Sequence, residues 1–522
     1  MTKITLSLLI LLACAGCTQQ IEKIERPNIV FMVCDDLNDY IGVFGGHPQA
    51  QTPNMNALAE SGLIFLNAQS NIPVCSPSRN SFLTGVYPHD SEDFGWTPRT
   101  KQKMLQHNKT FIDLFQENGY YVAGSGKIYH THESTPWDDW GANLTHNYGP
   151  FAFNGENRVA HPNVPLPYRE IGPIDGSFGP FLSSNSSSTN EARIEWMQGW
   201  DEETFHYISD NDRDMTNDEK HAAFAIQKIK ELEAKSVDQP FFIGLGFVRP
   251  HTPLHAPEKY FNMFPLDEIK LDRWQEEDDS DTWYADNFNT DMKGLKYYRM
   301  LLASYNGDRE MALKSFLQAY LACIAFVDDQ IGKVVDAIRS SSYADNTMII
   351  LTSDHGWQMG EKSYLFKNSA WEESCRVPLI ISGAGTKIGK IAQPVSLVDL
   401  FPTLVDYGQL AGSNRINDQG GKLGGYSLRP LLEDPENGQW PGPAGALSII
   451  GNYTSIKDST LVGQNFSYRT IDWRYIRYHD KREELYDHRV DPYEWNNLAS
   501  DSLHQNILVQ LRTEMDALVF GE

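Results

Sequence analysis

Four short runs of apolar residues are each followed at once by polar side chains that could do chemistry. Apolar runs of this length are typical of strands buried on both faces of a sheet. In α/β sheets, ligands bind beyond the carboxyl ends of such strands. The polar residues that the four runs bring to this edge are Asp35, Asp36, Lys127, His130, His251, Asp354 and His355. Their convergence predicts a functional site there.

Two neighbouring carboxylates, Asp35 and Asp36, come directly after the apolar run at 28–34. A hard cation such as calcium takes several oxygen ligands from aspartates, and Asp354 could supply a third. The plainer interpretation is that such a pair caps a helix or a turn. The presence of Asp354 and His355 at a second strand end favours the metal site.

Cys75 stands in a polar, turn-like segment and could be a nucleophile. Pro77 suits the first turn of a helix, which would place Ser76 or Cys75 near its N-cap. Arg79 lies four residues after Cys75, so both side chains would project from one face. A helix N-terminus beside a guanidinium stabilises anionic oxygen. Taken alone, however, a cysteine near an arginine is more simply a buried thiol.

The elements that must position these residues alternate between strands and helices. The apolar runs predict strands at 28–34, 120–124, 241–247 and 347–353. Helical patterns lie between them at 54–60, 111–118, 217–234 and about 312–339. This alternation predicts an α/β fold with a large central sheet flanked by helices.

Two other stretches have a different composition. Residues 132–214 are rich in Asn, Gly, Ser, Pro and Trp, which predicts long surface loops that could shape the mouth of a pocket. A glycine-rich loop at 412–425 indicates a domain boundary. Beyond it, 448–450 and 466–478 predict a small antiparallel sheet, with a helix at about 503–518 packed on it.

The composition is that of a globular protein, because hydrophobic residues make up 41% and aromatic residues 12% of the 522-residue chain. This length favours one large and one smaller domain, and with the loop at 412–425 as the boundary they would be an N-terminal domain at 26–425 and a C-terminal subdomain at 426–522. The 44 basic and 69 acidic residues give a net charge of −25, which should repel nucleic acids and anionic membranes. An anionic substrate would therefore need cations that belong to the site itself.

The first residues predict export. Lys3 precedes an apolar run at 4–13 that is too short to span a bilayer but suits a secretory signal. The following AGC, which ends at Cys17, resembles the bacterial lipobox, although Cys14 stands where that pattern usually has Leu. We therefore expect 1–17 to be a signal, with the protein anchored through a lipid on Cys17 in the periplasm, the outer membrane or the cell surface. An ordinary signal peptide is the alternative.

The segment CSPSR at 75–79, followed by LTG at 83–85, resembles the signature of the type I, formylglycine-dependent sulfatases. The resemblance covers nearly the whole mature chain and is strongest to the iduronate 2-sulfatase subgroup. Further motifs that carry it are DDL at 35–37, TPN at 52–54, GKIYH at 126–130, RPHTP at 249–253, TSDHGW at 352–357, SLVDLFPT at 396–403 and RTID at 469–472. The resemblance implies an alkaline-phosphatase-like sandwich with a mixed central sheet and a smaller C-terminal α+β subdomain.

In that family, the signature cysteine is oxidised to formylglycine (3-oxoalanine), whose hydrate supplies the nucleophilic oxygen. Cys75 would then need a formylglycine-generating or anaerobic sulfatase-maturating enzyme as a partner. The resemblance assigns one calcium ion to Asp35, Asp36, Cys75, Asp354 and His355. It assigns the aldehyde hydrate to Arg79 and His130, and the sulfate group to Lys127, His251 and Lys367. Calcium and the two lysines would stabilise the non-bridging sulfate oxygens, and His251 could protonate the leaving sugar oxygen.

The implied activity is removal of sulfate from a carbohydrate, such as the algal polysaccharides ulvan or carrageenan, or a glycosaminoglycan. Two other functions stay open. A phosphatase or phosphodiesterase on the same scaffold would more usually have a Ser or Thr nucleophile and two zinc ions. A non-catalytic glycan-binding lipoprotein could stack sugar rings on exposed tryptophans. The candidates for such stacking are Trp137, Trp140, Trp196 and Trp200, for most of which ordinary packing is the simpler interpretation.

Overall fold

The computed structural model describes residues 26–133, 136–141, 148–183, 195–201, 203–235, 239–271, 273–286, 292–451 and 460–521. The predicted signal, with Cys14 and Cys17, lies outside these residues, so export and lipid attachment stay predictions. The four cysteines in the described part of the chain are all buried and free: Cys34, Cys75, Cys323 and Cys375.

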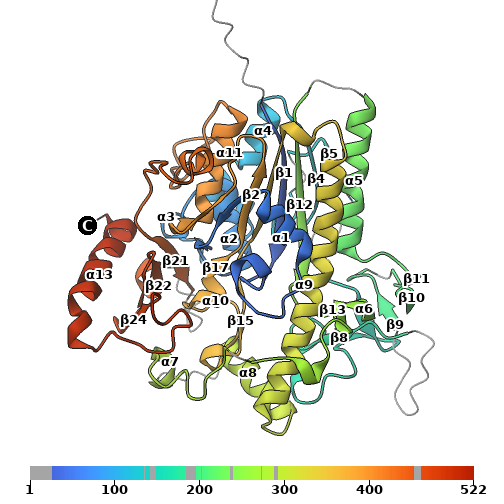
Figure 1. Cartoon of the computed structure of the whole chain (residues 1–522), viewed down its shortest axis with the longest axis vertical. Helices are drawn as coiled ribbons and strands as arrows, with labels where there is room; N and C mark the ends of the chain where they lie inside the picture. Colours follow the sequence, from blue (N-terminus) through green and yellow to red (C-terminus); the bar gives the residue numbers. More distant parts are fainter. Residues whose placement is uncertain are drawn as a thin grey trace, which may run out of the picture.

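An eight-stranded mixed sheet with the order β19-β2-β18-β14-β1-β12-β4-β5 forms the centre of the molecule (Figure 1). Four parallel neighbours at its middle are the predicted strands: β14 (Thr347–Ser353), β1 (Asn28–Asp35), β12 (Phe241–Pro250) and β4 (Tyr121–Gly126). The outer strands are β18 (Leu379–Gly383), β2 (Gly62–Phe65), β19 (Gly389–Ile391) and β5 (Asp139–Trp140). β18 runs antiparallel to both β14 and β2, so the sheet is mixed.

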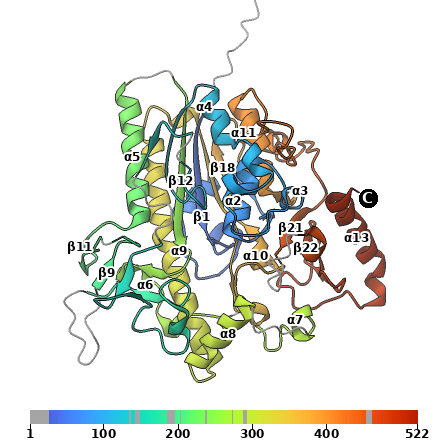
Figure 2. The same ribbon diagram turned by 180° about the vertical axis from the view of Figure 1, so that it is seen from behind.

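Both faces of the sheet are buried, and alternate residues of β1 belong to different cores. Val30, Met32 and Cys34 join one apolar cluster, whereas Ile29, Phe31 and Val33 join the other. The first cluster includes helices α1 (Pro53–Glu60), α5 (Asn217–Lys235), α8 (Lys293–Ser304) and α9 (Arg309–Arg339). The second includes α2 (Cys75–Thr84), α4 (Phe111–Glu117), α11 (Leu400–Gly408) and α12 (Arg429–Glu433). Figures 1 and 2 view these two helical layers from opposite sides.

α9 is long and apolar enough to cross a bilayer by length and composition. However, 78% of its most apolar window is buried inside the protein, and the helix packs on α5, α1 and β12. This is the pattern of a core helix in a globular domain.

The described part of residues 132–214 contains more regular structure than surface loops alone. Besides β5, it forms β6 (Phe151–Phe153), β7 (Arg158–Val159), β8 (Phe178–Pro180), β9 (Glu195–Met197), β10 (Tyr207–Ser209) and β11 (Asp212–Arg213). A small core of Phe181, Trp196, Phe205 and Tyr207 supports these strands. β8 pairs with β13 (Leu254–Ala256), just beyond the end of β12, so this region lies against the central domain.

Short elements complete the central domain. The helices are α3 (Pro88–Ser91), α6 (Glu258–Phe261), α7 (Trp283–Asp286) and α10 (Glu372–Cys375). The strands are β3 (Ala68–Gln69), β15 (Gln358–Met359), β16 (Leu365–Phe366), β17 (Arg376–Val377) and β20 (Val395–Ser396).

The predicted C-terminal sheet has four antiparallel strands: β21 (Ala446–Ile450), β22 (Asn465–Arg469), β23 (Trp473–Arg477) and β24 (Glu483–Asp487). α13 (Gln505–Phe520) packs on it. Ile72 and Val74 belong to the same apolar cluster, and Ile449 N donates to Asn71 O at 2.8 Å. The C-terminal sheet therefore helps to hold the segment that leads into Cys75. The domain boundary between 425 and 426 stays a prediction.

Candidate active site

The carboxyl ends of the four central parallel strands meet at one edge of the sheet. The parallel register pairs Cys34 with Ser353 and Asp35 with Pro250. It therefore brings the residues after β1, β12 and β14 side by side, as the apolar runs predict. At the end of β4, the backbone of Gly126 has a φ of 84° and lies against the Gly246 carbonyl, where a side chain would clash. This close approach directs the next residue, Lys127, toward the site.

Cys75 is the first residue of α2, and Val74 occupies the N-cap without a side-chain cap. The thiol is fully buried. Its Sγ lies 3.2 Å from His355 Nε2 and 2.9 Å from Lys367 Nζ. Burial, together with the charge of Asp35, raises the pKa of the thiol to about 11. An unmodified Cys75 is therefore a neutral thiol at pH 7, which is a poor nucleophile.

Arg79 is also fully buried and ties three strand ends together. Its Nε donates to Asp354 Oδ2 at 2.8 Å, its Nη1 donates to the Lys127 carbonyl, and its Nη2 lies 3.5 Å from Asp35 Oδ1. Ser78 Oγ of the same helix donates to the Asp354 carbonyl at 2.6 Å. The first two turns of α2 thus fix the position of Cys75 relative to the sheet.

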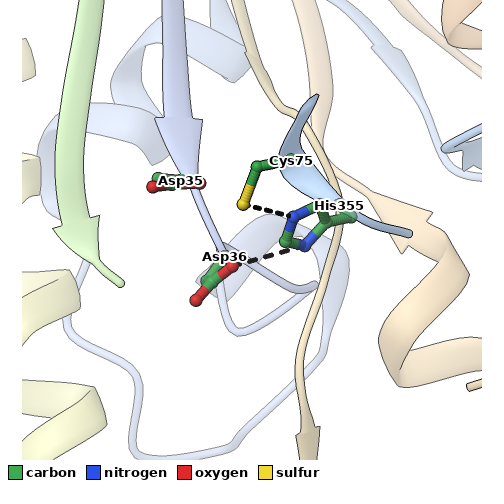
Figure 3. Close-up of side chains that lie close together, drawn as sticks. All are labelled: Asp35, Asp36, Cys75 and His355. Carbon is green, nitrogen blue, oxygen red and sulfur yellow. Dashed lines mark hydrogen bonds and ion pairs between the residues drawn. The ribbon is translucent and has the colours of Figure 1, made fainter. Parts of the chain in front are cut away.

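Four side chains offer metal-ligating atoms that all lie within 4.8 Å of one another: Asp35, Asp36, Cys75 and His355. Figure 3 shows them converging from β1, α2 and the segment after β14. We call these four residues the site cluster. Asp35 Oδ1 and Asp36 Oδ2 are buried, yet neither accepts a hydrogen bond from any residue that the structure describes. A buried carboxylate oxygen that accepts no hydrogen bond is costly, and a bound cation would reduce that cost.

The site cluster fits a hard cation in most of its donors. Carboxylate oxygens are the ligands that calcium prefers, whereas a thiol sulfur is not, so an oxygen in place of the Cys75 sulfur would improve the fit. Burial raises the pKa of Asp36 well above its usual value, a penalty that a bound cation would remove. Asp354 lies beside the cluster, where its Oδ1 accepts the backbone N–H of His355 at 3.0 Å and its Oδ2 meets Arg79.

Three further cationic or titratable groups face the aspartates. Lys127 Nζ donates to Asp35 Oδ2, and Lys367 Nζ donates to Asp36 Oδ1 at 2.9 Å. His251 Nε2 lies 3.6 Å from Asp36 Oδ2. Burial, reinforced by the charge of Lys367, holds the pKa of His251 well below its usual value.

The N-terminal three quarters of the chain, residues 27–410, match the family model described as Sulfatase. Residues 360–520 match the model described as N-sulphoglucosamine sulphohydrolase, C-terminal. The chain belongs to the sulfatase family. It is therefore a sulfuric ester hydrolase, with the alkaline-phosphatase-like α/β fold and the C-terminal antiparallel sheet that the sequence motifs imply.

Relatives of this sulfatase match it along most of both chains. A sulfatase of Formosa agariphila is 31% identical, over 92% of this chain and 85% of the relative. Iduronate 2-sulfatase of Mus musculus is 25% identical, over 94% of this chain and 93% of the relative. Among solved structures, one in complex with its substrate D-glucosamine-2-N,6-O-disulfate has a TM-score of 0.65 and 22% identity, and covers 95% of this chain and 98% of its own.

The sulfatase also places residues at this edge that no sequence motif indicated. Tyr148 accepts a hydrogen bond from Lys127 Nζ at 3.1 Å, and its ring stacks on His251 with the ring centroids 4.5 Å apart. Arg249 Nη2 donates to the carbonyl oxygen of Tyr148 at 3.1 Å and so fixes its backbone. Tyr148 lies in the glycine- and asparagine-rich stretch, where no periodicity marks a site residue.

The remaining predicted residues and tryptophans are distributed as follows. His130 lies half-buried in the segment after β4, with its ring 5.1 Å from that of Trp96. Trp196 is buried in the small core at 1% exposure, and Trp137 and Trp140 pack against the second core of the sheet. Trp196 is therefore a core residue and Trp137 and Trp140 are partly buried packing residues, whereas Trp200 is 47% exposed.

Proposed function

We propose that this sulfatase removes sulfate from a sulfated carbohydrate, using a formylglycine made from Cys75 and one calcium ion. The observation that carries the proposal is the setting of Cys75, a buried residue at a helix start between Lys367 and His355. The names of two similar proteins, an iduronate 2-sulfatase and a structure with a disulfated glucosamine, support a sugar substrate.

Two groups complete the proposed site. The hydrate of a formylglycine at position 75 supplies an oxygen nucleophile and a second hydroxyl that allows sulfate to leave, and calcium held by the site cluster and Asp354 stabilises charge on sulfate oxygens. The proposed roles of the other side chains follow from their positions. Lys127 and Lys367 face the same aspartates and would hold the non-bridging sulfate oxygens, while Arg79 lies on the helix of Cys75 and would hold the aldehyde hydrate. The same role for His130 rests on the family resemblance alone.

His251 is the proposed proton donor to the leaving sugar oxygen. Its Nδ1 lies 2.5 Å from the Thr252 carbonyl oxygen, so Nδ1–H donates there and Nε2 faces the site. The ring must be protonated at Nε2 to act as an acid, although burial holds its pKa low. The negative charge of a bound sulfate ester favours that protonation.

The proposal is tested with the full chain, expressed with and without a maturase. Mass spectrometry of the peptide that contains Cys75 measures conversion to formylglycine, and ion chromatography measures sulfate release. We expect release only from converted protein, and none from Cys75→Ala. Cys323→Ala is the matched control, because Cys323 is an equally buried free thiol in α9. Normal turnover by Cys75→Ala would contradict the nucleophile assignment.

The substrate class is tested with defined sulfated oligosaccharides from ulvan, carrageenan and glycosaminoglycans, alongside an aryl sulfate and an aryl phosphate with EDTA as control. We expect algal oligosaccharides to be the best substrates, with glycosaminoglycans as the second candidate. Preferential release of phosphate would instead place the enzyme with the phosphatases of this scaffold. Binding of glycans without release of sulfate by converted protein would favour a non-catalytic lipoprotein.

Export and lipidation at Cys17 belong to the same proposal. The basic and apolar leader and the AGC that ends at Cys17 support them. Cell fractionation of the full chain should find the protein with membranes, and Cys17→Ala should release it into the soluble exported fraction. An unchanged distribution of Cys17→Ala would contradict the lipid anchor.

A further inference from the structure

Trp96 is a large aromatic side chain that remains exposed beside the candidate active site. It follows α3 and is 43% exposed. Single exposed aromatic residues are normal on protein surfaces and need no explanation by themselves. Trp96 differs because its short segment is anchored by neighbours of three of the proposed catalytic residues.

The first anchor is the helix that carries Cys75. Ser76 Oγ and Asn80 Nδ2 both donate to the Thr97 carbonyl oxygen, at 3.3 and 3.2 Å. Asn80 Nδ2 also donates to Asp93 Oδ2 at 2.7 Å. The two ends of the segment 93–97 are therefore tied to the first two turns of α2, and Trp96 is fixed next to the N-terminus of that helix.

The second anchor is the segment after β4. The Trp96 ring lies 5.1 Å from the ring of His130, at an angle of 54°. His130 is three residues beyond Lys127, whose Nζ pairs with Asp35 in the site. The indole therefore lies on the side of the site where β4 ends.

The third anchor is the segment that carries Lys367. The side chain of Asn368 pairs with the backbone of Gly451, accepting from its N–H at 3.1 Å and donating to its carbonyl oxygen at 2.9 Å. A methyl group on Gly451 would lie 3.4 Å from the carbonyl oxygen of Phe94, two residues before Trp96. The Trp96 segment thus lies between the elements that present Cys75, Lys127 and Lys367.

The residues around position 75 and the Trp96 side chain differ in chemistry and suit different parts of a sulfated sugar. Cys75, Lys127 and Lys367 are at most 2% exposed and, under the proposed function, bind the sulfate group. The sugar that carries the sulfate is larger and would lie toward the surface, where Trp96 offers a flat apolar face. The C–H face of a pyranose ring is apolar while its rim carries hydroxyls, so it can stack on an indole. Because the segment 93–97 is hydrogen-bonded to α2 and the indole lies against His130, Trp96 should lose little conformational entropy when a sugar binds.

We propose that Trp96 is the platform on which the substrate's pyranose ring stacks while its sulfate group reaches residue 75. The inference rests on the proposed function and adds a binding site for the sugar. It makes sugar recognition at this site separable from sulfate recognition, because the indole touches the ring and not the sulfate.

The test compares Trp96→Ala and Trp96→Phe with the wild type on a sugar sulfate that the wild type hydrolyses. We expect Trp96→Ala to raise KM about tenfold, with kcat changed less than threefold, because stacking contributes mainly to binding. Trp96→Phe should recover most of the affinity. Inorganic sulfate should inhibit all three proteins with the same inhibition constant, because it needs only the charged residues around position 75 and not the indole.

The matched control is Phe520→Ala. Phe520 is 39% exposed, close to the exposure of Trp96, but it lies at the end of α13, where it packs on Phe466 and lies under the Arg477 guanidinium. KM should be unchanged in this variant. An unchanged KM in Trp96→Ala would overturn the proposal, as would an equal rise in KM for Phe520→Ala or a parallel loss of inhibition by inorganic sulfate. Failure of the proposed function is distinct, because the converted wild type would then release no sulfate from any sugar in the panel.

Discussion

Two buried clusters of charged side chains in this sulfatase contain similar residues, but their carboxylates differ in how many hydrogen-bond donors they have. One is the site cluster. The other, which we call the C-terminal cluster, joins α10 to the C-terminal sheet and consists of Glu372, Arg469, Arg474, His488 and Glu494. Both bring carboxylate and imidazole atoms within 4.8 Å of one another, so both have the spacing of a metal site.

The difference lies in the partners of the carboxylates. Arg474 forms ion pairs with both Glu372 and Glu494, and Arg469 Nε lies 3.2 Å from Glu372 Oε2. His488 Nε2 lies 2.9 Å from Glu494 Oε1. Burial alone would raise the pKa of Glu372, but Arg469 and Arg474 outweigh it and hold that pKa well below its usual value. In the site cluster, two buried oxygens have no hydrogen-bond donor among the described residues.

The comparison shows that ligand spacing alone does not identify a metal site. A carboxylate whose oxygens already accept hydrogen bonds from guanidinium groups has no need of a cation. A carboxylate with an unsatisfied buried oxygen retains the capacity to bind one. We therefore interpret the C-terminal cluster as structural and the site cluster as functional, and the predictions below test this distinction.

The largest expected effect is on catalysis. Asp36→Asn should lower kcat about 10³-fold, because it removes a charge from the proposed cation site. Glu494→Gln should leave kcat of the folded enzyme within about threefold, because the C-terminal cluster contacts no proposed catalytic residue. The measurement is sulfate release per formylglycine, quantified by mass spectrometry. Equal losses in the two variants would remove the functional distinction between the clusters.

The second effect is on folding stability. Arg474→Met should lower the free energy of unfolding by about 3–5 kcal/mol, because it leaves Glu372 and Glu494 buried without their main partner. Arg512→Met is the control, because its pair with Glu483 is partly exposed, and it should change stability by less than about 1 kcal/mol. Urea unfolding measures both. A loss in Arg474→Met no greater than in the control would contradict the structural assignment.

Removal of metal should also distinguish the two clusters, through a modest change in unfolding temperature. EDTA is expected to lower the unfolding temperature of the wild type by about 2–4 °C, with recovery on addition of calcium, since a ligand that binds only the folded state stabilises it. The unfolding temperature of Asp36→Asn should not change on addition of calcium, whereas that of Glu494→Gln should rise as in the wild type. A calcium response that depends on Glu494 would reverse the assignment.

The C-terminal cluster also predicts a pH dependence. The pKa of Glu372 is held below its unfolded value near 4.5, with Arg469 and Arg474 overcoming the effect of burial. Its stabilising contribution is therefore fully present above pH 4.5 and is lost as the pH falls through the folded-state pKa. The difference in unfolding free energy between the wild type and Arg474→Met should thus shrink as the pH is lowered from 6 toward 3. A difference that is constant over this range would argue against an electrostatic origin.

The smallest expected effect belongs to Tyr148, which borders the site cluster. Tyr148→Phe removes the hydroxyl that accepts from Lys127 and keeps the ring that stacks on His251. We expect kcat/KM to fall about threefold to tenfold, since one hydrogen bond to a charged group is lost. Tyr148→Ala should lower kcat/KM further, because it also removes the ring that stacks on His251. Equal kcat/KM for the two variants would mean that the stacking has no part in catalysis.

The sequence by itself determined the central strands, the sheet edge where Asp35, Asp36 and His355 lie, and a helix that begins near Cys75, although its N-cap is Val74. These features depend on local patterns. A buried parallel strand needs a continuous apolar run, and the polar residues that follow the run lie at the carboxyl edge of the sheet. The sulfatase motifs around Cys75 could also be recognised from the sequence, because their residues are contiguous in the chain. The proposed roles of the site residues still await the experiments above.

Only the tertiary structure decided which charges are satisfied and which aromatic rings line the site. Arg79 and Arg474 are both buried arginines, but whether their carboxylate partners keep a free oxygen depends on residues distant in the sequence. Trp96 and Tyr148 lie in stretches without periodicity, and contacts distant in the sequence bring their rings against His130 and His251. The physical reason is that hydrophobic patterning sets strands and helices locally, whereas hydrogen-bond satisfaction and ring stacking arise only when separate segments pack together.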